Sequence, residues 1–502
     1  MHRFVLVLVA VGTLVGPTGA GAQRNTSAAG VSIDTMRLRA VSRALAHDSL
    51  GGRETGSPGA AAAASYIADR LREMGLQPTT PDGAFTRPVP IRTVSVDATS
   101  RLTLRAGPDS AVLAYGPDFV VVPPDSASSL SIEGEVWFLG TGGDATTAVR
   151  PGDPRGRVLA VLGGLPEAAD SILDAWAANG AAAVMVLLPD SDAFAAARRQ
   201  LGATRYELQG ATAPFRPEPP LPVIVTSVEV SRALLQSVSV PPRVPGRPFE
   251  AVRLAYSVSA AVRLTRTPVD AVNVVAIIPG SDPARRDELV VYTAHYDHIG
   301  MGQPDESGDS IYNGFSDNAA GVAMVIAIAE ALRREPPARS VAFLFLTGEE
   351  RGLLGSTHAA AVPPWPGGLA RVRALINLDG GAPPVPPVSW RIAGGLARDS
   401  SVTPLGALAD SLAHRAGWTA TLETARPNSD YWPFSEKGVP AILIIPGNEW
   451  EGTTTEERDA LRKRWDRYHH PTDEYREDFP FSGLKRYAEF ALTIGRALAN
   501  MR

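Results

Sequence analysis

The chain has no cysteine among its 502 residues, and no apolar run in it reaches the length of a membrane span. The lack of cysteine excludes a disulfide framework and an amino-terminal cysteine modified with lipid, so stability must come largely from a packed core. Lysine is scarce beside arginine, and the formal net charge is −5. Because the chain lacks a basic field, we expect no nucleic-acid partner.

The first residues are typical of a signal peptide. A short positive start, Met1 to Arg3, precedes an apolar core from Phe4 to Gly16, and Ala20-Gly-Ala22 forms a small-residue cleavage signal. The apolar core is too short and too rich in glycine to cross a membrane. We therefore expect removal of residues 1–22, export to the periplasm or the medium, and no stable membrane insertion after cleavage.

Three apolar, β-branched segments in the second half predict buried strands: Glu288–Ala294, Ser340–Leu346 and Ala374–Leu378. Between the first two, residues Asn318–Arg334 are rich in alanine, valine, isoleucine and leucine and predict a helix. Alternating strands and helices indicate an α/β fold with a mixed, mostly parallel central sheet flanked by helices. In such a sheet, functional groups gather outside the carboxyl ends of the strands.

Histidine and acidic residues follow these strands at that edge. They are His295 and Asp297 after the first strand, Glu349 and Glu350 after the second, and Asp379 after the third, with Asp317 at the start of the helix and His469 further along the chain. Imidazole nitrogen and carboxylate oxygen are zinc ligands, and paired zinc ions about 3.5–4 Å apart need a bridging carboxylate. Asp317, held at a helix start, suits that bridge. The adjacent glutamates can divide between binding metal and taking a proton from water.

The same segments resemble the co-catalytic zinc exopeptidases. The resemblance covers roughly residues 273 to 474 and consists of the ordered motifs His-x-Asp, Asp-Asn-Ala-x-Gly, Gly-Glu-Glu-x-Gly-x-x-Gly-Ser, Asn-Leu-Asp, Ser-Asp-x-x-Pro-Phe and Tyr-His-x-Pro-x-Asp. It implies that His295, Asp317 and Asp379 hold one zinc and that Asp317, Glu350 and His469 hold the other. It also implies Glu349 as general base, Tyr468 as hydrogen-bond donor to the oxyanion, and Asp297 as the group that orients the His295 ring. Ser316 departs from the acidic or amide residue found there in many members.

The length indicates more than one domain. We expect residues 35–116 to be the first part of the peptidase domain and residues 249–502 its main part. Between them, residues 117–248 are bounded by proline-rich segments and contain short predicted strands. The order of these strands resembles a protease-associated domain, which implies a β-rich α+β insert.

The resemblance implies a metallo-aminopeptidase with two Zn²⁺ ions and peptide substrates. Carboxypeptidases and dipeptidases of the same superfamily are alternatives, since they differ in whether the pocket recognises an amine or a carboxylate. The one-zinc glutaminyl cyclases and the metal-free binding homologues fit the full ligand set less well. Nothing in the sequence indicates an oligomeric state.

Two further features lie near the motifs. His298 follows Asp297 in the same loop, so it is a candidate for the lining of the substrate cleft. Residues Ser429–Phe434 are either a turn with buried aromatic rings or a wall of the specificity pocket, and Arg426 lies just before them.

Overall fold

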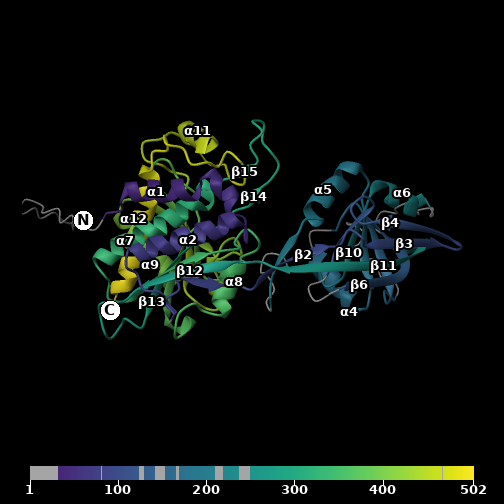
Figure 1. The fold of residues 1–502 in the computed structure, drawn as a ribbon, viewed down its shortest axis with the longest axis horizontal. Coiled ribbons are helices and arrows are strands. Elements are labelled where there is room, and N and C mark those ends of the chain that lie inside the picture. The colour runs from purple at the N-terminus through teal and green to yellow at the C-terminus, as the bar shows by residue number, and fades with distance from the viewer. Residues whose placement is uncertain are drawn as a thin grey trace, which may run out of the picture.

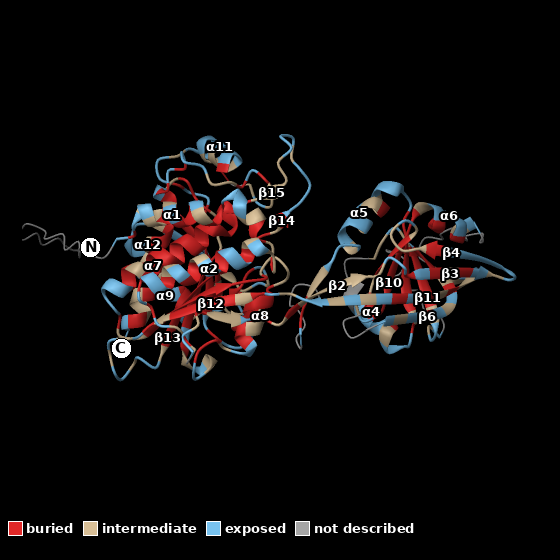
Figure 2. Ribbon diagram, in the orientation of Figure 1, coloured by how far each residue is buried: buried red, intermediate tan, exposed pale blue. Residues whose placement is uncertain are grey.

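The computed structural model describes residues 32–80, 82–123, 129–141, 153–165, 169–209, 219–236, 249–465 and 467–501. These residues form two lobes side by side, and β2 (Ile91–Val96) and β11 (Val252–Pro268) run between them (Figure 1). Each lobe has its own buried interior (Figure 2). The expected signal peptide, residues 1–22, lies outside the described residues.

The main lobe is built on a mixed eight-stranded sheet. Its four central strands are parallel, and antiparallel strands join on both sides, which confirms the predicted fold class. In sheet order the strands are β1 (Thr86–Pro88), β12 (Val272–Ile278), β16 (Ser340–Leu346), β13 (Leu289–His295), β17 (Val372–Leu378), β20 (Ala441–Pro446), β18 (Ser389–Leu396) and β19 (Thr419–Thr424).

Helices cover both faces of this sheet, so its central strands are buried on both sides. Every residue of β13 and β16 is buried, as continuous apolar runs in a parallel sheet require. One face packs against α1 (Thr35–Leu45), α2 (Pro58–Glu73), α7 (Ala320–Arg334), α9 (Pro404–Arg415) and α12 (Ser482–Asn500). The other packs against α8 (Leu354–Ala361) and α10 (Tyr431–Glu436). The remaining elements of this lobe are η1 (Asp48–Arg53), β14 (Gly300–Met301), β15 (Ile311–Tyr312), η3 (Leu369–Arg371) and α11 (Thr455–Trp465).

Helix α7 lies against the centre of the sheet and is preceded by a single π-type turn, η2 (Phe315–Ala319). Turn and helix together are long and apolar enough to cross a membrane by length and composition, which corrects the expectation that no stretch reaches that length. Of the apolar window, 89% is buried inside the protein, so the segment is placed as a core helix.

The second lobe is built on a larger sheet of ten strands. Four of its neighbouring strands, β6, β7, β8 and β10, are parallel and lie within residues 117–248, where short strands were predicted. The strands are β2, β3 (Arg101–Ala106), β4 (Asp109–Ala114), β5 (Phe119–Val122), β6 (Ser129–Thr141), β7 (Arg157–Leu162), β8 (Ala183–Leu187), β9 (Arg205–Leu208), β10 (Val223–Thr226) and β11; the helices are α4 (Ala169–Ala178), α5 (Ser191–Leu201) and α6 (Val228–Gln236).

The predicted insert boundaries at 117 and 248 fall inside this lobe. Strands β3 and β4 precede residue 117, and β11 follows residue 248, yet all three belong to the ten-stranded sheet. Strands of the ten-stranded sheet therefore lie on both sides of the predicted range. The edges of the lobe lie at the start of β2 and the end of β11, near residues 91 and 268, where the chain leaves and re-enters the main lobe.

The lobes meet beside the segment that carries the two adjacent glutamates. Leu208 of β9 packs with Ile91 and with Leu354 of α8 in a small shared core. Next to it, the Tyr206 hydroxyl donates to Glu54 Oε1 at 2.9 Å, and Arg351 Nη2 donates to the same oxygen at 2.6 Å. The second lobe is thus tied to the loop that follows β16.

Candidate active site

The predicted site residues converge at the carboxyl edge of the parallel strands. His295 is the last residue of β13, Glu349 and Glu350 follow β16, and Asp379 follows β17. Asp317 lies in η2 at the start of the core helix. His469 arrives from the loop after α11, where its φ of 53° places it in the left-handed region. Two clusters of possible metal donors result, each with its donor atoms within 4.8 Å of one another.

The first cluster contains His295, Glu349 and Asp379. His295 Nε2 lies 3.2 Å from Asp379 Oδ1 and 3.1 Å from Asp317 Oδ1. Its other ring nitrogen, Nδ1, lies 3.1 Å from the backbone carbonyl of Asp297. The nitrogen that faces the carboxylates is therefore the one available to a cation, and the opposite nitrogen fixes the ring.

The second cluster contains His298, Asp317, Glu350 and His469. His469 Nε2 lies 3.2 Å from Asp317 Oδ2 and 3.0 Å from Glu350 Oε2. The two oxygens of Asp317 thus face different clusters, Oδ1 toward His295 and Oδ2 toward His469. This arrangement matches the bridging role predicted for Asp317.

The backbone around Asp317 is held on both sides. The buried carboxylate of Asp473 accepts hydrogen bonds from the Ser316 amide at 2.9 Å and from the Asp317 amide at 3.2 Å. Asn318 donates to the Leu378 carbonyl at 3.0 Å and accepts from the Gly321 amide at 2.9 Å. A Cβ at Gly321 would lie 2.1 Å from the Asn318 side chain, which explains the glycine of the Asp-Asn-Ala-x-Gly motif.

The histidines and carboxylates of the two clusters shift one another's pKa values strongly. Burial opposes protonation of His295, but the neighbouring carboxylates outweigh it and hold its pKa well above the ordinary value. In the same way, burial lowers and two carboxylates raise the pKa of His469, which rises to about 10. Burial alone would raise the pKa of Asp317, yet its bonds to both imidazoles bring it well below the usual range. The site therefore demands positive charge, which protons or metal ions can supply.

Asp297 and His298 hold the ligand groups from behind. The fully buried Asp297 carboxylate accepts from the Thr55 hydroxyl at 2.8 Å and from the Glu349 amide at 3.2 Å, and lies 3.7 Å from His295 Nδ1. His298 is also fully buried, and its Nδ1 lies 2.7 Å from Glu350 Oε1. It is not among the residues that line the cavity beside the clusters, and it contacts Glu350 from behind.

A chain of hydrogen bonds reaches Asp379 from inside the sheet. Thr293 donates to Asn377 Oδ1 at 2.7 Å, Asn377 Nδ2 donates to Ser429 Oγ at 2.6 Å, and Ser429 donates to Asp379 Oδ2. Asn377 stands in the Asn-Leu-Asp motif. Nothing in the sequence singles out Thr293, because it stands inside an apolar strand. Ser429 stood in a quoted motif, and its role is to orient Asp379.

The segment Ser429–Phe434 is therefore a buried support and not a wall of the specificity pocket. Ser429, Asp430, Tyr431 and Phe434 are buried, and only the preceding Asn428 lines the cavity. The rings of Tyr431 and Phe434 pack into the core that α8 and α10 cover, whereas Trp432 is partly buried and lines a separate cavity. Arg426 does not line the cavity either.

Arg53 is a second group that sequence reasoning missed. It is 1% exposed and donates to the carbonyl oxygens of Leu45, Tyr296, Asn313 and Gly314. Burial lowers its pKa to about 10, while the acidic residues of the site act in the opposite direction. Its fixed positive charge therefore offsets part of the carboxylate charge nearby.

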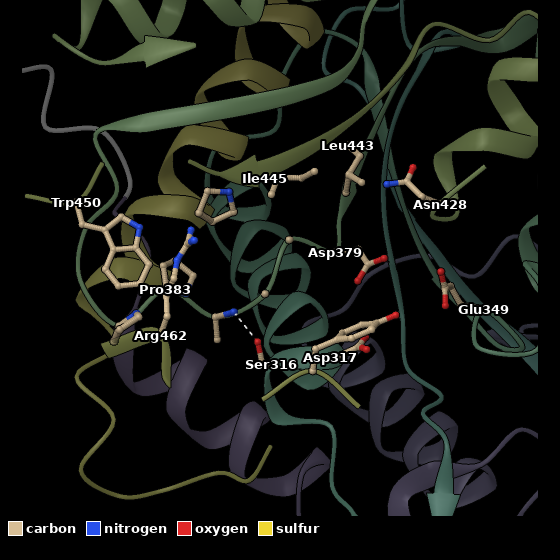
Figure 3. A pocket seen from close by; sticks show the side chains of 16 residues that line it. Ser316, Asp317, Glu349, Asp379, Pro383, Asn428, Leu443, Ile445, Trp450 and Arg462 are labelled. Carbon is tan, nitrogen blue, oxygen red and sulfur yellow. Dashed lines mark hydrogen bonds between the residues drawn. The ribbon is translucent and has the colours of Figure 1, made fainter. Parts of the chain in front are cut away.

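A cavity of about 300 Å³ opens beside the two clusters (Figure 3). Asp317, Glu349, Asp379 and Tyr468 line one part of it. The Tyr468 side chain is 69% exposed, and its ring stacks on that of His469 with 3.8 Å between centroids. Partial desolvation, with acidic groups nearby, raises the pKa of its hydroxyl, so the group stays a hydrogen-bond donor.

The donor set fits zinc. Only imidazole nitrogens and carboxylate oxygens converge, and the shared carboxylate of Asp317 faces both clusters. His295, Glu350 and Asp379 each have a further partner that orients them. The imidazole nitrogens and carboxylate oxygens lie within ion-pair distance of one another. The same donors are placed to hold a pair of divalent cations.

Comparison with known proteins agrees with this site. Residues 273–494 match the family model described as Peptidase family M28. Aminopeptidase YwaD of Bacillus subtilis is 27% identical over 192 residues, which are 38% of this chain and 36% of that protein. A probable zinc metalloprotease of Pyrenophora teres is 32% identical over 112 residues, which are 22% of this chain and 23% of that protein. The matches thus span about a quarter to a third of these relatives.

Among solved structures, an aminopeptidase from Aneurinibacillus sp. strain AM-1 is similar, with a TM-score of 0.55 and 17% identity over 94% of this chain and 95% of that chain. At this identity the likeness concerns the fold alone. The fold that the two chains share extends over both lobes, because the match covers nearly the whole of each.

Proposed function

The chain belongs to peptidase family M28 through residues 273–494, and from this premise we propose that it is a zinc-dependent aminopeptidase that removes amino-terminal residues from peptides. The observation that carries the proposal is the placement of Asp317. Its two oxygens lie 3.1 Å from His295 Nε2 and 3.2 Å from His469 Nε2, as a carboxylate shared by two metals requires.

We propose two zinc ions per chain. His295, Asp317 and Asp379 would hold one, and Asp317, Glu350 and His469 the other. When bound, the two ions polarise the scissile carbonyl and lower the pKa of the attacking water.

The chain's own groups then move protons and stabilise charge. The Glu349 carboxylate, at the edge of the cavity, takes the proton of the attacking water and returns it to the leaving amine. Burial raises the pKa of Glu349 well above its ordinary value, and the neighbouring carboxylates of Asp379, Asp430 and Glu350 act in the same direction, which suits a group that must hold a proton between steps. The Tyr468 hydroxyl donates to the oxyanion of the tetrahedral intermediate.

The free amine of the substrate is the expected recognition element at the acidic end of the cavity. Glu349, the carboxylate of that end that we do not assign to a metal, can accept a charge-assisted hydrogen bond from an ammonium group. An acetylated amino terminus lacks this charge.

A mass-spectrometric time course tests the proposal. One unblocked peptide and its acetylated twin are incubated with the mature chain before and after zinc removal by chelation. Stepwise loss of residues from the unblocked amino end alone, abolished by chelation and restored by zinc, is expected. Trimming of both peptides from the carboxyl end would instead establish a carboxypeptidase.

We also propose that residues 1–22 direct export and that the second lobe is a protease-associated domain that controls access to the cleft. The support for export is the residue pattern alone, and the support for the domain is the parallel order of β6, β7, β8 and β10. Expression of the full chain in a bacterial host checks export: the mature protein should begin near Gln23 and leave the cytoplasm.

A further inference from the structure

The cavity beside the clusters has a second end, which the reaction described above does not use. Arg462 and Trp450 lie at the end away from Asp379 and Glu349 (Figure 3). Apolar side chains also line the cavity: Leu443 and Ile445 lie between the two ends (Figure 3), and Pro383 and Pro446 complete the apolar lining. The cavity therefore has an acidic end, an apolar middle and one cation at the far end.

The position of Arg462 is fixed by two contacts. Its Nη2 donates to Asn448 Oδ1 at 2.8 Å, and its guanidinium carbon lies 5.6 Å from the centroid of the Trp450 ring. Trp450 is buried and Arg462 is partly buried. In the described part of the chain, no carboxylate lies within ion-pair distance of this guanidinium. Asn448 and Trp450 hold the group in place, and its positive charge has no anionic partner among these residues.

Arg458, one turn earlier on α11, serves as a comparison. Its Nη1 donates to the Asn448 carbonyl at 2.6 Å, but its Nη2 pairs with Asp459 at 2.7 Å, and it does not line the cavity. Two arginines of one helix thus contact the same residue, Asn448. Only Arg462 reaches the cavity.

The physical consequence concerns what fills the far end. A neutral apolar side chain there would take water from the guanidinium without replacing its hydrogen bonds, which costs free energy. A carboxylate replaces those bonds with charge-assisted ones, and the planar guanidinium fits it in bidentate fashion.

We propose that Arg462 binds a carboxylate of the substrate, so that this enzyme prefers substrates whose cavity-bound part ends in a carboxylate. The proposal rests on the proposed peptidase function and specifies its substrate class. Two sources carry this chemistry: the side chain of an amino-terminal glutamate or aspartate, and the terminal carboxylate of a short peptide.

Two substrate pairs distinguish the sources. The first pair is a peptide amide that begins with glutamate and its twin that begins with glutamine. The second is a short leucine-first peptide as free acid and as amide. For each, kcat/KM is measured with the zinc-loaded wild type, R462M and the matched control R458M.

The wild type should favour the carboxylate member of one pair by about tenfold or more, in line with a charge-assisted hydrogen bond. This ratio should fall to below about twofold in R462M and stay unchanged in R458M. The leucine-first amide should react at similar rates with all three proteins, which shows that each is folded. The pair that carries the preference identifies the source.

Equal rates within each pair for the wild type would overturn the inference, and so would an equal loss on all substrates in R462M. In both cases hydrolysis of the leucine-first amide leaves the peptidase function standing. Absence of hydrolysis of every substrate by the wild type would overturn the proposed function and this inference with it.

Discussion

At the scale of single residues, some side chains of the site face the cavity or the metal positions, and others contact only those side chains. Asp317 faces both donor clusters, and Glu349 and Tyr468 line the cavity. Asp297 and His298 lie behind them and contact the groups that face the substrate. Their substitution should therefore change metal affinity or alignment, whereas substitution of the residues in the cavity should change chemistry.

Replacement of the two central carboxylates should have different effects. Glu349→Ala should keep both metals and lose about 10³-fold in kcat, because it removes the proton acceptor alone. Asp317→Ala should weaken both metal sites, because each metal loses a shared ligand. Metal content by mass spectrometry and kcat are measured together, with Glu306→Ala on an exposed loop as control.

A Glu349 variant that has lost a metal would move Glu349 into the ligand set. Two tightly held zinc ions in the Asp317 variant would contradict the bridge.

Asp430 should make stability depend on pH. It is 0% exposed, and burial raises its pKa from 3.8 to about 7. The folded protein then holds the proton that an unfolded chain releases near pH 4. This contribution to stability is full below about pH 4 and is lost as pH rises through about 7.

Asp430→Asn cannot ionise, so it should gain about 1–3 kcal/mol in stability relative to wild type between pH 5 and pH 8. Chelator-treated proteins are compared by urea unfolding at several pH values. Exposed Asp459→Asn is the control. A constant difference between wild type and Asp430→Asn across this range would show that Asp430 does not titrate there.

At the scale of elements, the sequence predicted the bounds of single strands and helices most accurately. Strand β16 lies at the predicted residues, β13 is displaced by one residue, and the core helix begins at Ala320, two residues after the predicted Asn318. These segments have strong apolar patterns. The ligand residues could be predicted because they stand immediately after such strands.

The walls of the cavity could not be predicted in the same way. Trp450 and Arg462 come from the loop after β20 and from α11, and only the packing of these segments brings them to Asp379. The place of β3 in the second lobe could not be predicted, because its neighbour β11 lies more than 130 residues away in the chain and short-range patterns carry no information on such pairing.

Turn η2 should depend on Asp473, which lies more than 150 residues away from it in the chain. Asp473→Ala leaves the amides of Ser316 and Asp317 without their acceptor, so we expect about 2–4 kcal/mol lower stability and about 10–100-fold weaker metal binding. Thermal unfolding and zinc titration measure the two effects. Asp478→Ala, at an exposed position, should change neither.

Unchanged zinc affinity in the Asp473 variant would mean that the backbone of η2 holds its shape without this carboxylate.

At the scale of the whole molecule, the two lobes have separate hydrophobic cores (Figure 2). All donors of both clusters belong to the main lobe. Metal binding therefore adds stability to one lobe directly and reaches the other only through the small contact near Tyr206 and Arg351.

Metal removal should accordingly separate two unfolding transitions. Zinc at about 1,000 times its Kd contributes about 4 kcal/mol, and for a lobe of this size the loss lowers Tm by roughly 8–16 °C. Calorimetry with and without chelator should show the main-lobe transition shifted and the second transition unchanged. An equal shift of both would show that the lobes unfold as one unit.

The path of the chain between the lobes has a meaning of its own. Strands β2 and β11 are antiparallel neighbours, and Arg92 lies opposite Pro268 and Val96 opposite Leu264. The polypeptide thus departs from the catalytic body and comes back to it at adjoining points. Because closure of a loop between adjoining points costs little, and grows slowly with loop length, an insertion at this junction can vary in size at small cost to the catalytic body. The second lobe is in this sense a cassette, which the zinc-binding edge constrains where Tyr206 contacts Glu54 and Arg351.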